Sequence, residues 1–545
     1  MSLKSRFCDT IHAQYWIKGK GVSKEYLNTM AFYFFYILVI IGIASVFFSY
    51  PFVRLPYDAI AHLMAIDERY HDVAVSSTSI PPKRLIWHGL WATIFQIFHI
   101  ESVEFLLRTK IIHITQTLIA LFSVYYFSHV VIRNVFKDID SVMVKYLSLW
   151  SVIIWVTIFA TFSIYYHQVW VMWYSINYQI TLPLFFYITG LTLVLTLEKP
   201  SRRIQLFFIV QVFVLIWFIL QAHAMELLYY FLYVFVLALM YVKSTYRLIR
   251  TRPCLVTWAG IFGIFFIYMF KHDNSKFSMY LMRAFDRNDP SYLYHKIVQA
   301  GEVVVSHYSR SAAVINEMMY MIFYVSLLAF IFMLWNVYRK KDIIKYKVLI
   351  FVVITSLFVV IPLYVFPAGL FGLITREHVV HRFYYSASLF VLLPILVYYI
   401  LHSFTVKLRY VNALMAILLI SVFYYSKSSN RVSHNYYKNI MSIKSSFDNK
   451  NIRFNLSQKH IEYIGTAIES YEKQNKTGKE TLYFARYDIA FVLKYVYGKK
   501  IWWKDRRTNY NHNKEYWDHY QYQSKRYHPV LYRTHGIFPK YVPFR

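Results

Sequence analysis

Apolar stretches of about 20 residues recur along most of the chain, and short polar segments separate them. A helix of that length crosses a bilayer core of roughly 30 Å, so about eleven stretches are candidate transmembrane helices. They cover residues 30–50, 111–132, 147–165, 175–197, 204–222, 227–242, 254–270, 318–338, 347–366, 384–401 and 410–425. The pattern predicts a polytopic α-helical membrane protein.

The polar segments between the apolar stretches alternate in character, which indicates the topology. Every second segment is short and basic, and these segments begin near Arg133, Lys199, Lys243, Arg339 and Lys407. Cytoplasmic loops carry an excess of Lys and Arg, so we assign these segments and the basic N-terminal residues 1–29 to the cytoplasm. The first loop, 51–110, then faces outward, as do 271–317 and 367–383. Within the first loop, residues 81–100 are typical of an amphipathic interfacial helix.

The composition becomes polar from about residue 426 onward. Residues 460–474 and 487–498 have helical periodicity, whereas 480–486 and 499–503 resemble short strands. We therefore predict a membrane domain over 30–425 and a small soluble α/β domain over 426–545. An odd number of spans after a cytoplasmic N-terminus places that domain outside the cytoplasm. The Tyr- and His-rich residues 507–529 show no clear period and stay unassigned.

Composition narrows the class of protein further. Hydrophobic residues make up 58% of the 545 residues and charged residues 16%, which excludes a cytosolic enzyme and a disordered chain. The two cysteines, Cys8 and Cys254, give no basis for a disulfide framework. The net charge of +31 fits the basic cytoplasmic segments of a membrane protein, so we do not expect a nucleic-acid partner.

The first outer loop contains the densest group of candidate catalytic residues. Asp58 and His62 are four residues apart and share one face of a helix, where the carboxylate can act as a general base. Asp67 and Glu68 form a second acidic candidate, and oxygen ligands of this kind suit a divalent cation such as Mg²⁺ or Mn²⁺. The alternative is a solvated loop whose acids are balanced by basic neighbours, among them Lys83 and Arg84.

A second group of candidates precedes the tenth apolar stretch. Arg376, His378, His381 and Arg382 lie within seven residues, and Arg binds phosphate through two parallel hydrogen bonds. A lipid phosphate lies at this depth, and the alternative is ordinary interfacial anchoring. His223 and Glu226 form a weaker candidate pair, three residues apart, for which a structural hydrogen bond is the competing interpretation.

The apolar stretches contain no Asp, Glu, Lys or Arg in their interiors. Transporters and pumps use such groups near the middle of the membrane, so their absence disfavours a transporter or flippase. Ionisable residues instead gather at the outer ends of the stretches, which favours chemistry at the outer membrane boundary.

The odd number of spans, the acidic first outer loop and the outward C-terminal domain together resemble the GT-C glycosyltransferases. This superfamily includes protein O-mannosyltransferases and bacterial oligosaccharyltransferases. The resemblance implies that an acid of the first outer loop acts as base, and Asp58 in PYDAIAHL best matches that position. Asp67-Glu68 in IDERY is the rival match. The RxHxxHRFYY stretch resembles the basic segments with which members hold the donor phosphate.

The resemblance implies transfer of a sugar from a polyprenyl-phosphate donor to a lipid-linked glycan or surface polysaccharide. The implied catalytic residues are Asp58, Asp67 and Glu68, and the implied substrate-binding residues are His62, Lys83, Arg84, Arg376, His378, His381 and Arg382. A bacterial inner membrane is the expected location. A polysaccharide polymerase or ligase is an alternative function, although such proteins usually lack a large soluble C-terminal domain. A glycolipid transporter is the other alternative.

Overall fold

The computed structural model describes much of the membrane-type region and part of the C-terminal region. The described residues are 24–48, 57–70, 86–101, 105–136, 139–156, 178–198, 200–223, 225–241, 263, 276–311, 324, 327–328, 331, 335, 343–358, 361, 364–375, 380, 383–403, 409–428, 458–474, 481–485, 489, 492–494, 496–499, 501–502, 528–533 and 536–538.

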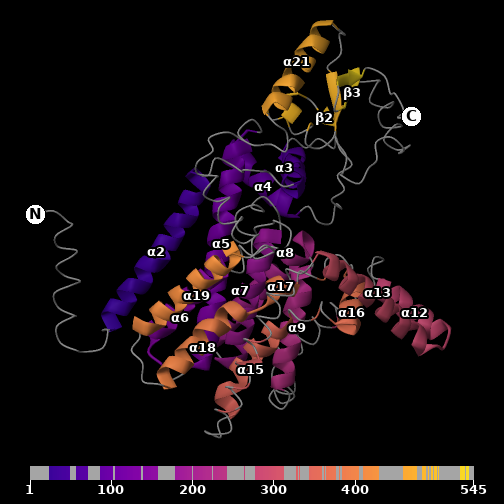
Figure 1. Cartoon of the computed structure of the whole chain (residues 1–545). Coiled ribbons are helices and arrows are strands. Elements are labelled where there is room, and N and C mark those ends of the chain that lie inside the picture. The colour runs from indigo at the N-terminus through magenta and orange to yellow at the C-terminus, as the bar shows by residue number, and fades with distance from the viewer. Residues whose placement is uncertain are drawn as a thin grey trace, which may run out of the picture.

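Helices dominate the described part of the chain. In chain order they are α2 (Lys24–Phe48), α3 (Tyr57–Tyr70), α4 (Ile86–Ile97), α5 (Phe105–Val135), α6 (Ser141–Ile154), α7 (Tyr178–Leu197), α8 (Arg202–Ala222), α9 (Met225–Met240), α12 (Lys276–Asp286), α13 (Pro290–Ser311), α15 (Ile343–Leu357), α16 (Val365–Ile374), α17 (Phe383–Ser386), α18 (Leu389–Ser403), α19 (Arg409–Ser428) and α21 (Gln458–Gln474). Most of the long apolar helices lie side by side in a bundle (Figure 1).

Three described helices are long and apolar enough to cross a membrane: Leu107–Val135, Ile180–Leu197 and Arg202–Ala222. Several shorter apolar helices, such as α6, α9 and α18, accompany them. The chain is therefore consistent with a helical membrane protein. Eleven spans remain a prediction, because most of 254–270 and most of 318–338 lie outside the described residues.

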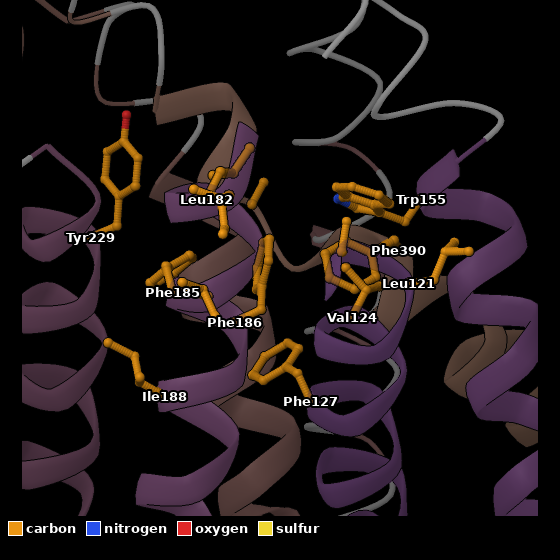
Figure 2. Close-up of a cluster of buried hydrophobic side chains, with 14 of the residues drawn as sticks. Leu121, Val124, Phe127, Trp155, Leu182, Phe185, Phe186, Ile188, Tyr229 and Phe390 are labelled. Carbon is orange, nitrogen blue, oxygen red and sulfur yellow. The ribbon is translucent and has the colours of Figure 1, made fainter. Parts of the chain in front are cut away.

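Aromatic side chains fill the centre of the bundle. Phe127 of α5, Phe186 of α7 and Phe390 of α18 meet with ring centroids 5.1–6.2 Å apart (Figure 2). Gly190 lets α7 approach α5 closely, since a Cβ at this position would lie 3.0 Å from the Tyr126 ring. The sequence segments that supply this core are far apart in the chain, so the packing joins the bundle into one body.

Two of the predicted spans are broken in the structure. The stretch 347–366 holds the end of α15, which stops at Leu357, and the start of α16, which begins at Val365. Pro362 lies between them; it has no N–H to donate within a helix and disfavours a helical residue before it. The stretch 384–401 is divided between α17 and α18. Each of these stretches therefore contains two helices, and its role as a membrane span stays a prediction.

The loop 271–317, which the sequence marks as polar, contains two further helices, α12 and α13. Together with α16 they lie to one side of the bundle (Figure 1). Asp289 caps α13, because its carboxylate accepts a hydrogen bond of 3.0 Å from the backbone N–H of Ser291. Pro290, at the first helical position, has no N–H that would need a partner.

The C-terminal region contains α21 and the strands β1 (Thr481–Ala485), β2 (Ile501–Trp502), β3 (His528–Arg533) and β4 (Gly536–Phe538). They form one sheet in the order β2-β1-β3-β4, in which β1 is parallel to β2 and β3, and β4 is antiparallel to β3. Helix α21 and strands β1 and β2 lie where the sequence predicts a helix and strands. Strands β3 and β4 were not predicted. That these elements form a separate domain stays a prediction.

Candidate functional site

Helices α3 and α4 of the first predicted outer loop lie side by side at one end of the bundle, next to the C-terminal region (Figure 1). They run in the same direction, because His62 meets His88 near their beginnings and the carbonyl of Tyr70 accepts a hydrogen bond of 2.7 Å from Gln96 near their ends. Trp87 and Phe95 of α4 are fully buried. The apolar face of α4 thus holds α3 against the bundle.

Arg108, near the start of α5, joins both helices to the bundle. One guanidinium nitrogen donates to Asp67 of α3 at 2.9 Å, and Nε donates to the carbonyl of Ile100 at 3.0 Å. The guanidinium also lies 4.2 Å from the ring centroid of Tyr70 and 5.1 Å from that of Phe95. Asp67 is 1% exposed and Arg108 4% exposed, so this ion pair is buried.

Asp67 also contacts the C-terminal region. Its second carboxylate oxygen forms an ion pair with the ammonium group of Lys494, which lies between β1 and β2 in the chain. Both oxygens of Asp67 are therefore held by cations. A buried carboxylate needs such partners, and this one links the first outer loop, the bundle and the C-terminal region.

Two histidines form a second cluster at the start of α3 and α4. Nδ1 of His62 lies 2.7 Å from Nε2 of His88, so one ring donates to the other, and the rings stack with centroids 4.9 Å apart. Burial, followed by the nearby His223, lowers the pKa of His62 to about 3. His62 is therefore neutral near pH 7, and its ring has one donor and one acceptor nitrogen.

His223 and Glu226 lie close to this histidine pair, at the junction of α8 and α9. Nδ1 of His223 is 2.6 Å from a carboxylate oxygen of Glu226, which is 1% exposed and lies in the first turn of α9. The unpaired backbone N–H groups at the start of a helix favour an acidic side chain at this position. A carboxylate at Nδ1 orients the imidazole so that its other nitrogen can accept a proton.

The structure thus brings together polar groups from three segments that lie far apart in the chain. These are α3 and α4 of the first loop, the junction of α8 and α9, and the region around Lys494. Of the residues predicted for the site, it places His62 in the histidine pair and Asp67 in the ion pairs. Asp58 and Glu68 lie on α3, but their side chains are outside the described part of the structure, as are Lys83, Arg84, Arg376, His378, His381 and Arg382.

Sequence reasoning missed His88, Arg108 and Lys494. Arg108 carried a signal, because it is a basic residue at the start of a long apolar stretch and therefore needs an anionic or polar partner. His88 lies in the predicted amphipathic helix 81–100, but its partner is 26 residues away. Lys494 gave no local signal, since its contact with Asp67 depends on how the C-terminal region folds against the first loop.

The described side chains do not include a group of three or more His, Cys, Asp or Glu residues arranged to hold a metal ion. The Asp67–Glu68 cation site stays a prediction. The surroundings of Asp67 disfavour a bound metal ion, because Arg108 and Lys494 already contact its two carboxylate oxygens. Neither a protein-family model, nor a curated protein, nor a solved structure matches this chain.

Proposed function

We propose that this protein is a membrane glycosyltransferase of the GT-C type, which transfers a sugar from a polyprenyl-phosphate donor to a glycan or glycolipid acceptor at the outer face of a membrane. The observation that carries the proposal is the convergence of α3, α4 and the α8–α9 junction at one end of the bundle. Acid and imidazole groups gather there, and the core that adjoins them is apolar.

The position of Asp58 on α3 supports its role as general base. Asp58 lies in the first turn of α3, one helical turn before His62. It is therefore at the same end of the helix as the His62–His88 pair. Asp67 is about two and a half helical turns further along and is held by two cations. Both carboxylate oxygens of Asp67 are therefore already occupied by cations and are not open to an acceptor hydroxyl. We therefore assign the base to Asp58 and a positioning role to Asp67.

The proposed reaction is a displacement at the anomeric carbon of the donor sugar. The acceptor hydroxyl oxygen forms the new glycosidic bond, its proton passes to Asp58, and the bond to the polyprenyl phosphate breaks. The phosphate leaves with the bonding electron pair and an added negative charge. Arg376, His378, His381 and Arg382 are the proposed partners for that charge, with Lys83 and Arg84 as further basic candidates. The expected eleven spans, soluble C-terminal domain and bacterial inner membrane belong to the same proposal.

Purified protein should transfer labelled sugar from one member of a panel of polyprenyl-phosphate sugars. Asp58→Asn keeps the size of the side chain but removes the proton acceptor, so turnover should fall by about 10²–10⁴-fold. Glu198→Gln is the matched control, because Glu198 is a carboxylate in an ion pair at the opposite end of the bundle. Equal activity in wild type and Asp58→Asn would remove Asp58 as the base. Absence of transfer from every donor would contradict the proposed function.

A further inference from the structure

The helices α12, α13 and α16 form a unit beside the bundle that the proposed site does not use (Figure 1). Two glycines allow α13 and α16 to touch along their backbones. A Cβ at Gly301 would lie 1.8 Å from the carbonyl oxygen of Val365, and one at Gly369 would lie 1.8 Å from that of Ile297. Any larger residue would force the helices apart. This close backbone contact therefore holds α13 and α16 in one relative position.

Helix α12 packs one face against this pair. Ala284 is buried, and Phe277 and Tyr280 pack against a small apolar cluster formed by Ile297, Ala300 and Leu373. The turn to α13 is closed by backbone hydrogen bonds from Asn288 and Asp289 to Phe285 and Ala284. The hydrogen bonds that cap α13 also lower the pKa of Asp289, since they stabilise its charged form. The orientation of α12 is thus set by its contacts.

A second apolar strip of α12 is exposed. Met279, Met282 and Phe285 follow one another at intervals of three residues, and Met282 and Phe285 are 66% and 76% exposed. Residues spaced by three lie on neighbouring positions of a helix surface, so the side chains form one strip. Exposed apolar side chains of this size in a group indicate a surface that something else covers.

Basic residues accompany the apolar strip. Lys276, Arg283 and Arg287 are exposed on or just after α12, and Asp286 is the acidic residue of the helix. Arg287 also lies 4.7 Å from the ring centroid of Tyr292. Long basic side chains place their apolar stems along a nonpolar surface while the charged ends reach toward anions or water. An apolar strip with Lys and Arg beside it matches the boundary between acyl chains and phosphate headgroups.

We propose that α12 lies in the headgroup–acyl boundary of the bilayer that surrounds the bundle, with Met279, Met282 and Phe285 toward the acyl chains. The helix has 11 residues, which gives a length of about 16 Å and is too short to cross a membrane. The unit lies to one side of the bundle (Figure 1), and the bundle includes α8, a candidate membrane span whose exposed side chains include Leu206, Phe207 and Trp217. A bilayer that surrounds α8 also surrounds the rest of the bundle. It therefore reaches the side of the bundle where α12, α13 and α16 lie.

The test measures which solvent surrounds the strip. Cys8→Ser and Cys254→Ser provide a background without reactive thiols, and Met282→Cys is then labelled with an environment-sensitive fluorophore. Glu302→Cys is the matched control, since Glu302 is exposed on the adjacent helix α13 and is not part of the apolar strip. Each labelled protein is placed in nanodiscs of phosphatidylcholine and phosphatidylglycerol with one copy per disc. Spin-labelled lipids quench a fluorophore in the bilayer, and iodide quenches one in water.

The proposal predicts that spin-labelled lipid quenches the label at position 282 and iodide does not, with the reverse result at position 302. Quenching of both labels by iodide alone would overturn it, because the strip would then face water. Protection of position 282 from both quenchers would also overturn it, since protein would then cover the strip. Phe285→Cys repeats the measurement if Met282→Cys does not give monodisperse protein. None of these outcomes depends on sugar transfer.

Discussion

The two ends of the helical bundle use charged residues in different ways. At the end where α3 and α4 lie, Asp67 and Arg108 form an ion pair that is almost entirely buried and that Lys494 extends. At the opposite end, where α5 and α7 finish, Arg133 and Glu198 form an ion pair whose side chains are 49% and 22% exposed. Asn134 also donates to Glu198 at 2.9 Å.

The difference has a physical consequence. Two exposed charges are already well solvated by water, so pairing them contributes only about 0–1 kcal/mol to the stability of the fold. Burial of a carboxylate and a guanidinium costs several kcal/mol of hydration, and only close, well-oriented partners offset that cost. A buried ion pair is therefore weak evidence of stability in itself, because well-packed apolar side chains often replace such pairs at no cost. Retention of buried charge is expected where chain segments must be held in one specific arrangement, as a reaction site requires.

The largest expected effect comes from separating the buried pair. Arg108→Met leaves Asp67 buried with Lys494 alone, and removal of one member of a buried pair costs about 3–5 kcal/mol. Arg133→Met at the other end should cost no more than about 1 kcal/mol. Unfolding midpoints in denaturant, measured in the same detergent, compare the two variants. Equal losses would mean that the two ends do not differ energetically.

Lys494 tests whether the ion pairs hold the C-terminal region against the first loop. Lys494→Met keeps the apolar stem but removes the cation, and loss of a hydrogen bond to a charged group costs about 1.5–3 kcal/mol. Because Arg108 still neutralises Asp67, the loss should be smaller than for Arg108→Met. Limited proteolysis should cleave the C-terminal region faster than in wild type. Lys473→Met, a change on α21, is the control. Unchanged cleavage after Lys494→Met would contradict the link.

Burial of His62 should make the α3–α4 end sensitive to acid. His62 has a pKa of about 3 in the folded protein and about 6.5 when unfolded, so the unfolded chain binds the proton first. Stability is therefore full above pH 6.5 and falls as the pH decreases toward 3, by about 1.4 kcal/mol per pH unit at most. His62→Gln should remove this part of the pH dependence, whereas His295→Gln on α13 should leave it unchanged. Equal pH profiles in all three proteins would contradict the burial of His62.

The sequence predicted the helical bundle and the helix at 81–100 well, because long apolar stretches and helical periodicity are local signals. It also identified the acidic segment that contains Asp58 and Asp67, both of which lie on α3. It did not predict that Asp67 is held by two cations, since Arg108 is 41 residues away and Lys494 lies in another region of the chain. Helices α12 and α13 were missed because their apolar positions are mixed with charged ones. Strands β3 and β4 depend on pairing across a sheet, which local periodicity does not encode.

The most direct test of the difference between the two ends is to find the side of the membrane on which each lies. In the Cys8→Ser, Cys254→Ser background, Glu101→Cys marks the α3–α4 end, where Glu101 is exposed, and Glu198→Cys marks the opposite end. A membrane-impermeant thiol reagent is added to intact cells, and a second sample is treated after the membrane is opened. We predict that position 101 reacts in intact cells and position 198 reacts after opening. Reaction of both positions from the same side, or the reverse pattern, would contradict the account.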